Sequence, residues 1–384
     1  MDWHLFTMIS RFYFNRIHKI ESTKIVFKSF NGKGFMDHGK YICKEILERG
    51  HQWDLVWLVN DLSIEVPDGI RKVSNRDLSQ MIYELSTAKI WVNDMLFGDY
   101  IRKRKGQIYV NTKHGTSLTL KKYGFDSPIF VQNKTIEKRW NYNSAITDMV
   151  ITGSDFDTKT YRSGFHYYGP VLQVGSPRAD ILFEPQKYAK KVKKKYEIPD
   201  DTSVLLYAPT FRVNKNGAGI DYMPPNIQPD FNLIANTLEK KTGKRWLIMV
   251  KQHPLCKISR IEYQQNILDV SEYEDTQELL CTADILITDY SSIMFDAAFV
   301  YKPVILFTYD WDTYLQNERE LWIDLKDLPF PIAYSQEELN SCLTAFKENE
   351  YKLQVSKFLS AFGVNEEGNA SKKVVDYIET IIKE

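Results

Sequence analysis

The chain has 384 residues, of which 43% are hydrophobic and 26% charged, and these are the values of a folded protein long enough for two domains. Lys plus Arg and Asp plus Glu both number 50, so no basic excess indicates a nucleic-acid partner. The four cysteines form no Cys-x-x-Cys pair, which signals neither a zinc site nor a disulfide framework and is typical of a reducing cytoplasm. Apolar runs fall short of the ~20 residues that a membrane-spanning helix needs, and we expect no signal peptide.

The first twenty residues differ from the rest of the chain. Arg11, His18 and Lys19 lie largely off an apolar stripe that forms when this segment is drawn at helical spacing. Two interpretations stay open: a helix lying in a membrane surface, and a helix packed against its own domain. The stripe consists of Leu5, Phe6, Ile9, Phe12, Tyr13, Ile17 and Ile20.

From residue 24 onward, short apolar runs alternate with helical patterns, which indicates parallel α/β architecture. The pattern breaks near residues 175–178, and a basic helix is expected at residues 185–196 before the alternation resumes. We expect strands at residues 24–30, 55–59, 89–93, 107–112, 148–152, 204–207, 245–250, 267–269, 283–288 and 303–307. We expect helices at residues 39–49, 79–87, 231–241, 277–281, 292–300 and 372–383.

This pattern predicts two doubly wound, Rossmann-like α/β domains with a hinge near residues 175–185 and a cleft between them. The N-terminal helix spans residues 1–20, the first domain residues 21–178 and the second residues 179–384. The final helix is expected to pack back on the first domain. In such folds a ligand binds at the carboxyl ends of the strands.

Polar clusters follow four of the predicted strands. They occupy residues 113–116, 208–212, 251–254 and 288–292. One polar residue after a strand is ordinary, but four clusters at the same kind of position predict one shared site.

The serine pair lies where a strand leads into a helix. A helix N-terminus presents unpaired N–H groups, so the hydroxyls of Ser291 and Ser292 are well placed to hold a phosphate. Simple capping of the helix is the alternative. Asp296 lies one turn later, where a carboxylate complements the helix dipole or braces the loop.

The other clusters supply cationic and imidazole groups. Arg212 suits a bidentate contact with phosphate, although a solvated or ion-paired arginine is the alternative. His253 and His114 come from different halves of the chain, and Gly115 allows close approach of a backbone. A lone histidine is usually structural, but two histidines beside an arginine and a serine pair favour a functional site.

Two Asp-x-Asp patterns, at residues 155–157 and 310–312, match a motif that holds a divalent cation under a nucleotide diphosphate. The pattern is common by chance. A site that neutralises phosphate with a helix end, arginine and histidine binds it without metal, so we predict no obligatory cofactor and keep a divalent metal as the alternative.

Taken together, these motifs resemble those of the CDP-glycerol:polyol-phosphate glycerophosphotransferase family, the teichoic acid primases and polymerases. Their order and spacing extend the resemblance over roughly residues 24–310. The motifs that carry it are Asn31-Gly32-Lys33-Gly34, His114-Gly115-Thr116, Gly175-Ser176-Pro177-Arg178, the run from Tyr207 to Arg212, His253-Pro254 and the run from Thr288 to Asp296.

The resemblance implies a GT-B type enzyme that transfers glycerol phosphate or ribitol phosphate from CDP-glycerol or CDP-ribitol and releases CMP. The implied acceptor is a hydroxyl of an undecaprenyl-diphosphate-linked saccharide or polyol-phosphate chain, in synthesis of teichoic acid or a related wall or capsule polymer. It implies peripheral attachment to the cytoplasmic face of the cell membrane and leaves a homo-oligomer open. Family polymerases often carry an extra N-terminal region, whereas only some twenty residues precede the first predicted strand. This favours a short, primase-like enzyme or a short-chain transferase, and a polymerase or a capsule enzyme stays open.

The resemblance also suggests roles for single residues. His114 is the expected base for the acceptor hydroxyl, and His253 the group that stabilises charge on the departing diphosphate. An anionic membrane would meet the N-terminal stripe, the basic residues 102–105 and residues 118–125. The expected substrate contacts are Gly115, Thr116, Arg178, Arg212, Thr288, Asp289, Ser291, Ser292 and Asp296.

Two other functions stay open. A sugar-nucleotide glycosyltransferase or epimerase could use the same fold, with Asp310 or Asp312 reading the ribose. An inactive lectin or scaffold that binds a lipid-linked polymer is the third possibility. Assays with CDP-glycerol and UDP-sugars separate the enzymes, and turnover separates both from a scaffold.

Overall fold

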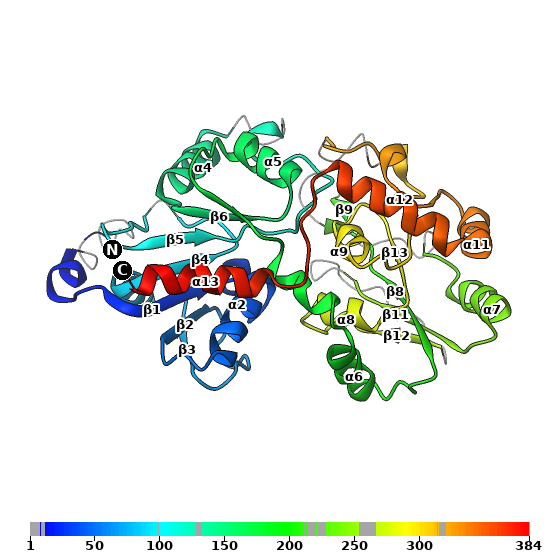
Figure 1. Cartoon of the computed structure of the whole chain (residues 1–384), viewed down its shortest axis with the longest axis horizontal. Coiled ribbons are helices and arrows are strands. Elements are labelled where there is room, and N and C mark those ends of the chain that lie inside the picture. Colours follow the sequence, from blue (N-terminus) through cyan, green and yellow to red (C-terminus); the bar gives the residue numbers. More distant parts are fainter. Residues whose placement is uncertain are drawn as a thin grey trace. The chain divides into compact units, whose positions relative to one another are not determined.

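The computed structural model describes residues 8, 12–98, 100–127, 133–210, 212–213, 220–221, 228–252, 266–312, 314 and 320–383. The chain divides into two compact units, each built on its own sheet (Figure 1). Unit 1 comprises Met1–Ser117, Tyr123–Asp180 and Asn365–Glu384, and unit 2 comprises Leu118–Lys122 and Ile181–Val364.

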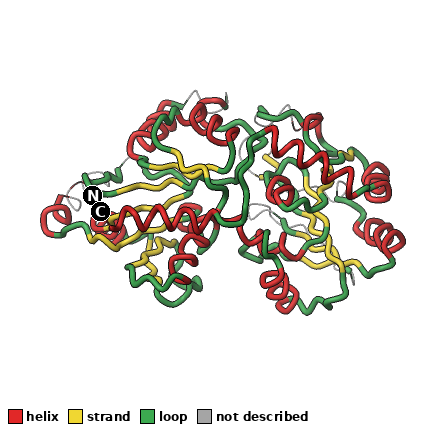
Figure 2. The backbone as a smooth tube through the Cα atoms, in the orientation of Figure 1, coloured by secondary structure: helices red, strands yellow, loops and turns green. Residues whose placement is uncertain are grey.

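Unit 1 is a seven-stranded parallel sheet of order β3-β2-β1-β4-β5-β6-β7 with helices on both faces (Figure 2). The strands are β1 (Glu21–Lys28), β2 (Asp54–Val59), β3 (Ile70–Ser74), β4 (Ala88–Asn93), β5 (Ile108–Asn111), β6 (Met149–Thr152) and β7 (Val171–Gln173). The helices are α2 (Asp37–Glu48), α3 (Leu78–Thr87), α4 (Lys134–Ile146), α5 (Asp155–Phe165) and α13 (Ala370–Lys383), with 3-10 turns at Phe30–Gly32, Gly124–Asp126 and Pro177–Leu182.

The core of unit 1 shows why its central strands are apolar throughout. Alternate side chains of a strand point to opposite faces, so Ile25 and Phe27 pack under α2 and α13 while Val26 packs under α3. Both faces are covered, and an alternating polar pattern is therefore absent. Arg49, directly after α2, donates to Asp376 and Glu379 of α13, both at 2.7 Å, which ties the last helix to unit 1.

Unit 2 is a six-stranded parallel sheet of order β12-β11-β8-β13-β14-β15. The strands are β8 (Ser203–Tyr207), β11 (Trp246–Val250), β12 (Ile267–Asp269), β13 (Ile285–Thr288), β14 (Val304–Phe307) and β15 (Ile332–Ala333), with a separate antiparallel ribbon of β9 (Arg212–Val213) and β10 (Ile220–Asp221). The helices are α6 (Gln186–Lys195), α7 (Phe231–Thr242), α8 (Thr276–Thr282), α9 (Ile293–Phe299), α11 (Gln336–Ala345) and α12 (Glu348–Ala361), with a 3-10 turn at Leu325–Asp327.

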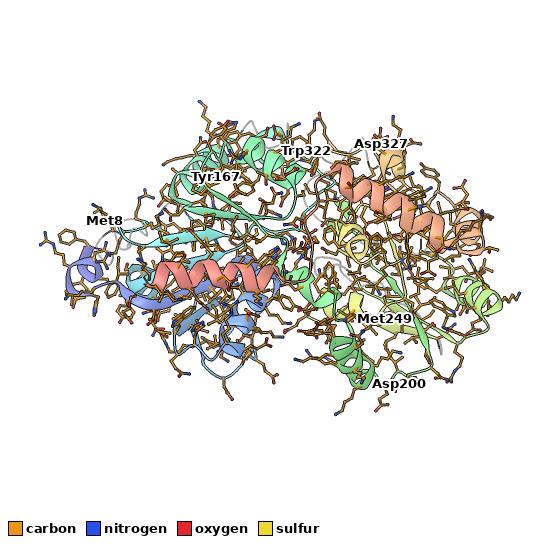
Figure 3. The ribbon with its side chains drawn as sticks, viewed as in Figure 1. Met8, Tyr167, Asp200, Met249, Trp322 and Asp327 are labelled. Carbon is orange, nitrogen blue, oxygen red and sulfur yellow. The ribbon has the colours of Figure 1, made fainter. Side chains whose placement is uncertain are left out.

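Figure 3 shows how side chains fill this unit. Met249 of β11 is fully buried, whereas Asp200, in the turn before β8, is exposed. The short segment Leu118–Lys122 also belongs to unit 2, although the sequence pattern places it in the first half. Its backbone pairs with residues 320–322: Lys122 N–H donates to Glu320 O and Trp322 N–H donates to Leu120 O, both at 2.8 Å.

The predicted fold class is confirmed, since both sheets are parallel and doubly wound. The strand order reverses at β1 and β4 in unit 1 and at β8 and β13 in unit 2. The sequence pattern missed β3 and β7, because these short strands at the sheet edges are only partly buried and carry no long apolar run.

The N-terminal segment packs partly against its own unit and partly faces outward, and its placement in a membrane surface stays a prediction. Residues 12–17 are helical, and the rings of Phe14 and His18 contact Tyr83 of α3 at 5.5 and 5.0 Å between centroids. Phe12 and Ile17 of the predicted stripe instead face outward, with 59% and 56% of their surfaces exposed. Leu5, Phe6 and Ile9 lie outside the described residues. Among the helices that the structure describes, none is both long and apolar enough to cross a bilayer.

Candidate active site

The loop that follows β5 carries His114, and its imidazole is paired with a carboxylate. His114 Nδ1 lies 2.9 Å from Asp37 Oδ2, and Arg178 Nη1 lies 3.2 Å from Asp37 Oδ1. Burial opposes ionisation of Asp37, but the charge of Arg178 together with the contacts of His38 and His114 outweighs it, so the pKa of this carboxyl lies well below its usual range. Asp37 is therefore an ionised acceptor at neutral pH.

This pairing determines which nitrogen of His114 carries the proton. An ionised carboxylate only accepts hydrogen bonds, so Nδ1–H donates to Asp37 and Nε2 keeps its lone pair. The side chain is 47% exposed, and its ring meets the edge of Phe30 at 4.4 Å. The imidazole of His114 is thus oriented by Asp37 and partly exposed, and its role as proton acceptor stays a prediction.

His38 supports the same loop from behind. Its Nε2–H donates to Gly115 O at 2.7 Å, and its Nδ1 accepts from the backbone N–H of Arg178 at 3.4 Å. Burial lowers the pKa of His38 to about 3, despite the opposing effect of Asp37. This histidine is neutral and holds the backbone beside His114.

Gly115 and Thr116 complete the loop. Gly115 has φ +116°, and no atom lies within 4 Å of the position that a Cβ would take there. Thr116 is buried, and its hydroxyl finds no hydrogen-bond partner within the described part of the chain. Lys113 donates to Thr116 O at 2.7 Å and pairs with Asp157 at 3.1 Å, which assigns a structural role to one acid of the first Asp-x-Asp pattern.

Backbone strain gathers around these loops. Of the seven non-glycine residues with positive φ in the described part of the chain, four lie here: Phe30, Asn31, Asp37 and Lys113. Each such conformation costs about 1–3 kcal/mol and persists where the surroundings hold it, commonly at functional sites. The strain therefore agrees with a functional assignment of this edge of the sheet.

Asp94, which follows β4, is a further acid at this edge. It accepts from Phe30 N–H at 2.9 Å, and burial together with the charge of Asp37 raises its pKa to about 8. Sequence reasoning missed Asp37 and His38, because neither follows a predicted strand, and it missed Asp94, because this acid follows the strand predicted at residues 89–93 without a cluster of polar residues after it. For Asp37 the available signal was an acid three residues after the glycine loop and just before a helical pattern.

In unit 2 the loop after β13 is fastened to the loop after β8. Thr288 donates to Ala208 O at 2.7 Å, and Asp289 accepts from both the N–H and the hydroxyl of Thr210 at 2.9 Å. Asp296 is buried and accepts from Gln277 at 3.1 Å. The structure gives these acids and Thr288 loop-holding contacts, and their predicted contact with substrate stays a prediction.

The serine pair differs from an ordinary cap. Ser292 occupies the N-cap of α9 with αR geometry and makes no side-chain capping bond, while Ser291 Oγ lies 3.5 Å from the N–H of Ile293. Both serines are partly exposed. The capping alternative therefore does not account for the Ser292 hydroxyl, and phosphate binding by the pair stays a prediction.

Tyr290, from the run that carries the serine pair, contacts Asp310 of the second Asp-x-Asp pattern. The Tyr290 hydroxyl donates to Asp310 at 3.0 Å, and its ring stacks on Tyr314 at 3.5 Å between centroids. His253 and the side chain of Arg212 lie outside the described residues. Within the described chain no group of three or more His, Cys, Asp or Glu side chains is arranged to hold a metal ion, and metal independence stays a prediction.

The comparisons with known proteins agree on one family. The model of the CDP-Glycerol:Poly(glycerophosphate) glycerophosphotransferase family matches residues 10–380. The chain is 28% identical to a teichoic acid poly(glycerol phosphate) polymerase of Staphylococcus epidermidis over 95% of its own length and 52% of that protein, so it spans about half of that relative. It is also 28% identical to a teichoic acid glycerol-phosphate transferase of Staphylococcus aureus, over 95% of both chains.

A solved structure extends this agreement to the fold. The structure of the wall teichoic acid polymerase TagF matches with a TM-score of 0.84 and 27% identity, over 99% of this chain and 96% of that one. The two doubly wound units therefore have a counterpart of the same architecture. The chain belongs to the CDP-glycerol:poly(glycerophosphate) glycerophosphotransferase family.

Proposed function

We propose that the protein transfers glycerol phosphate from CDP-glycerol to a hydroxyl of a lipid-linked saccharide or polyol-phosphate chain, releasing CMP. Ribitol phosphate from CDP-ribitol is the second candidate donor reaction. The observation that carries the proposal is the His114–Asp37–Arg178 arrangement in a chain of this family. A solved variant of the TagF polymerase soaked with CDPG supports the choice of donor.

In the proposed reaction the acceptor oxygen attacks the phosphorus that bears the glycerol. A bond forms between that phosphorus and the acceptor oxygen, and the bond from the same phosphorus to the oxygen bridging it to CMP breaks. His114 Nε2 takes the hydroxyl proton, and CMP leaves with the bonding electron pair. Phosphoryl transfer needs positioning and charge neutralisation more than covalent help, so Asp37 contributes by keeping Nε2 free and the imidazolium stabilised.

Donor contacts are assigned to unit 2. Ser291 and Ser292 are partly exposed at the start of α9. The Ser292 side chain makes no capping hydrogen bond, and that of Ser291, among the described residues, accepts only a long one, at 3.5 Å, from the N–H of Ile293. His253 and Arg212 are proposed to add charge on the diphosphate. Gly115 and Thr116 are proposed to line the acceptor side, where the open space at Gly115 and the unpartnered hydroxyl of Thr116 leave room for a contact.

The acceptor is proposed to reach the site from the cytoplasmic face of the membrane. The N-terminal helix exposes Phe12, Tyr13 and Ile17 while its other side packs on Tyr83, which suits peripheral attachment. The basic run at residues 102–105 contributes less than its sequence suggests. Arg104 donates to the carbonyls of Asn15 and His18, and Lys103 pairs with Asp148.

Turnover with defined substrates tests the proposal. The protein is incubated with CDP-glycerol, CDP-ribitol or a UDP-sugar and a lipid-linked disaccharide, and the product mass and the released nucleotide are measured. We expect CMP and a product heavier by one polyol phosphate. Turnover of the UDP-sugar alone would instead establish the glycosyltransferase or epimerase alternative, and binding without turnover would establish a scaffold.

Replacement of His114 by Ala tests the base. Loss of a general base costs ~10²–10⁴-fold in rate, so kcat should fall by this factor while donor affinity, measured by calorimetry, stays near that of the wild type. His51→Ala is the matched control, because His51 also pairs with a carboxylate, Glu379, at 2.9 Å. Near-normal turnover in His114→Ala would remove the base assignment.

A further inference from the structure

The side chain of Glu366 lies at the place where the chain returns to unit 1. The chain leaves unit 1 after Ser117 and again after Asp180, and it comes back for the last time at Asn365. Glu366 accepts from the Ser117 hydroxyl through Oε1 and from the backbone N–H of Ser176 through Oε2, the latter at 3.0 Å. Glu366 itself lies one residue after the third passage, and its carboxyl group bonds to residues within four positions of the other two.

The surroundings of this carboxyl leave little spare space. A Cβ on Gly153 would lie 1.7 Å from Ser117 Oγ and 2.9 Å from Glu366 Oε1, so only glycine fits. A Cβ on Gly175, which has φ +100°, would lie 2.9 Å from Glu366 Oε2. The N–H of Asn365 also donates to Gly153 O at 2.7 Å, which fixes the returning segment beside the end of β6.

The two segments bonded to Glu366 are the ones that support the His114–Asp37 pair. Ser117 lies three residues after His114 in the same loop. Ser176 lies two residues before Arg178, whose guanidinium bonds Asp37 and whose N–H bonds His38. Burial raises the pKa of Glu366 to about 7, with the charge of Asp180 adding to the rise, so neutral and ionised forms coexist near neutral pH.

We propose that Glu366 is a positioning residue that holds the His114 loop and the Arg178 segment in register at the passages between the two units. The proposal rests on the proposed function, because it names a residue on which the geometry of the proposed base depends. Glu366 acts through Ser117 and Ser176 rather than on the substrate. Its loss should affect the chemical step and leave binding of the donor by unit 2 unchanged.

The test compares four variants by kcat for CMP release, by donor affinity and by Tm. Glu366→Ala and Ser117→Ala should lower kcat by ~10- to 100-fold, since small displacements of a catalytic group have effects of this size. Glu366→Gln should keep most of the turnover, because its amide oxygen accepts from Ser176 N–H and its amide nitrogen can donate to Ser117 Oγ. Glu367→Ala is the matched control, since this exposed neighbour pairs only with Lys373 among the described contacts of charged groups, at 2.7 Å.

Two outcomes would overturn the proposal: wild-type kcat in Glu366→Ala, or a loss that lies wholly in donor affinity. If Glu366→Ala fails to fold, Ser117→Ala decides, because it removes a single hydroxyl and wild-type turnover there would have the same meaning. If the wild type turns over no CDP-polyol, the proposed function fails separately. The position of His114 is then read from the NMR signals of its imidazole, which should shift in Glu366→Ala or Ser117→Ala, and wild-type signals in both would overturn the proposal.

Discussion

At the scale of single residues, the orientation of His114 depends on the ionised form of Asp37. Replacing Asp37 by Asn puts an amide donor against Nδ1, which moves the ring proton to Nε2 and removes the free base. We expect kcat to fall by ~10²–10⁴-fold. The variant should also lower Tm, because Arg178 loses the buried carboxylate that balances its charge.

The measurement for Asp37→Asn is steady-state CMP release together with thermal unfolding. Asp68→Asn serves as the control, since Asp68 is an exposed acid of the same unit. A variant with wild-type kcat would show that Asp37 only balances Arg178 and has no part in orienting His114.

The lowered pKa of His38 leads to a prediction for the stability of the protein in acid. Its folded pKa of about 3 lies below the ordinary value of 6.5, so the unfolded state binds more protons between these two pH values. Stability should therefore fall as pH drops from 6.5 toward 3. His38→Gln, which can still donate to Gly115 O, removes this titration, and its loss of stability over the same range should be smaller.

Urea unfolding of the wild type and of His38→Gln at several pH values in this range measures the difference. Asp37 loses its stabilising charge in acid in both proteins, so the difference between the two profiles reports the titration of His38 together with its effect on Asp37. Parallel pH profiles would contradict a buried, neutral His38.

At the scale of elements, a serine replacement at the start of α9 tests whether its hydroxyl binds the donor or only caps the helix. Ser292→Ala should weaken CDP-polyol binding from a few-fold to ~100-fold, the effect of losing ~1–3 kcal/mol of hydrogen bonding to a charged group. Ser335 at the start of α11 is the matched control, because it does cap its helix, accepting from Glu338 N–H at 3.2 Å. Ser335→Ala should cost about 1 kcal/mol of stability and leave donor affinity unchanged.

Calorimetry with CDP-glycerol and urea unfolding of both variants make this comparison. Unchanged donor affinity in a folded Ser292→Ala protein would withdraw the serine pair from the proposed site. Both hydroxyls are partly exposed, whereas Thr288 shortly before them is fully buried.

At the scale of the whole molecule, the exposed face of the N-terminal helix predicts membrane association. Phe12→Ser combined with Ile17→Ser should reduce co-sedimentation with anionic liposomes at low salt, because each change removes exposed apolar surface that would enter the interface. Leu62→Ser is the control, since Leu62 is also an exposed apolar residue of unit 1, at 52%. Wild-type protein that remains free of such liposomes would refute the membrane prediction.

The sequence by itself determined the architecture and the family. Apolar runs such as those of β1 and β8 alternate with helical patterns. Strands that are buried on both faces require apolar residues at successive positions, so they can be recognised in the sequence. The histidine, serine-pair and Asp-x-Asp motifs could be identified because each is a short local run, so short-range spacing was enough. Edge strands such as β7 were not predicted, because a partly buried strand needs no continuous apolar run.

Only the tertiary structure decided which side chains serve one another. Asp37 and His114 are separated by 77 positions, and Ser117 and Glu366 by 249, so no local spacing relates them. They meet because parallel strands bring their carboxyl ends to one edge and because the last helix returns to unit 1. The protonation of Asp37 and His38 likewise depends on burial and on neighbouring charge, and both are properties of the folded chain.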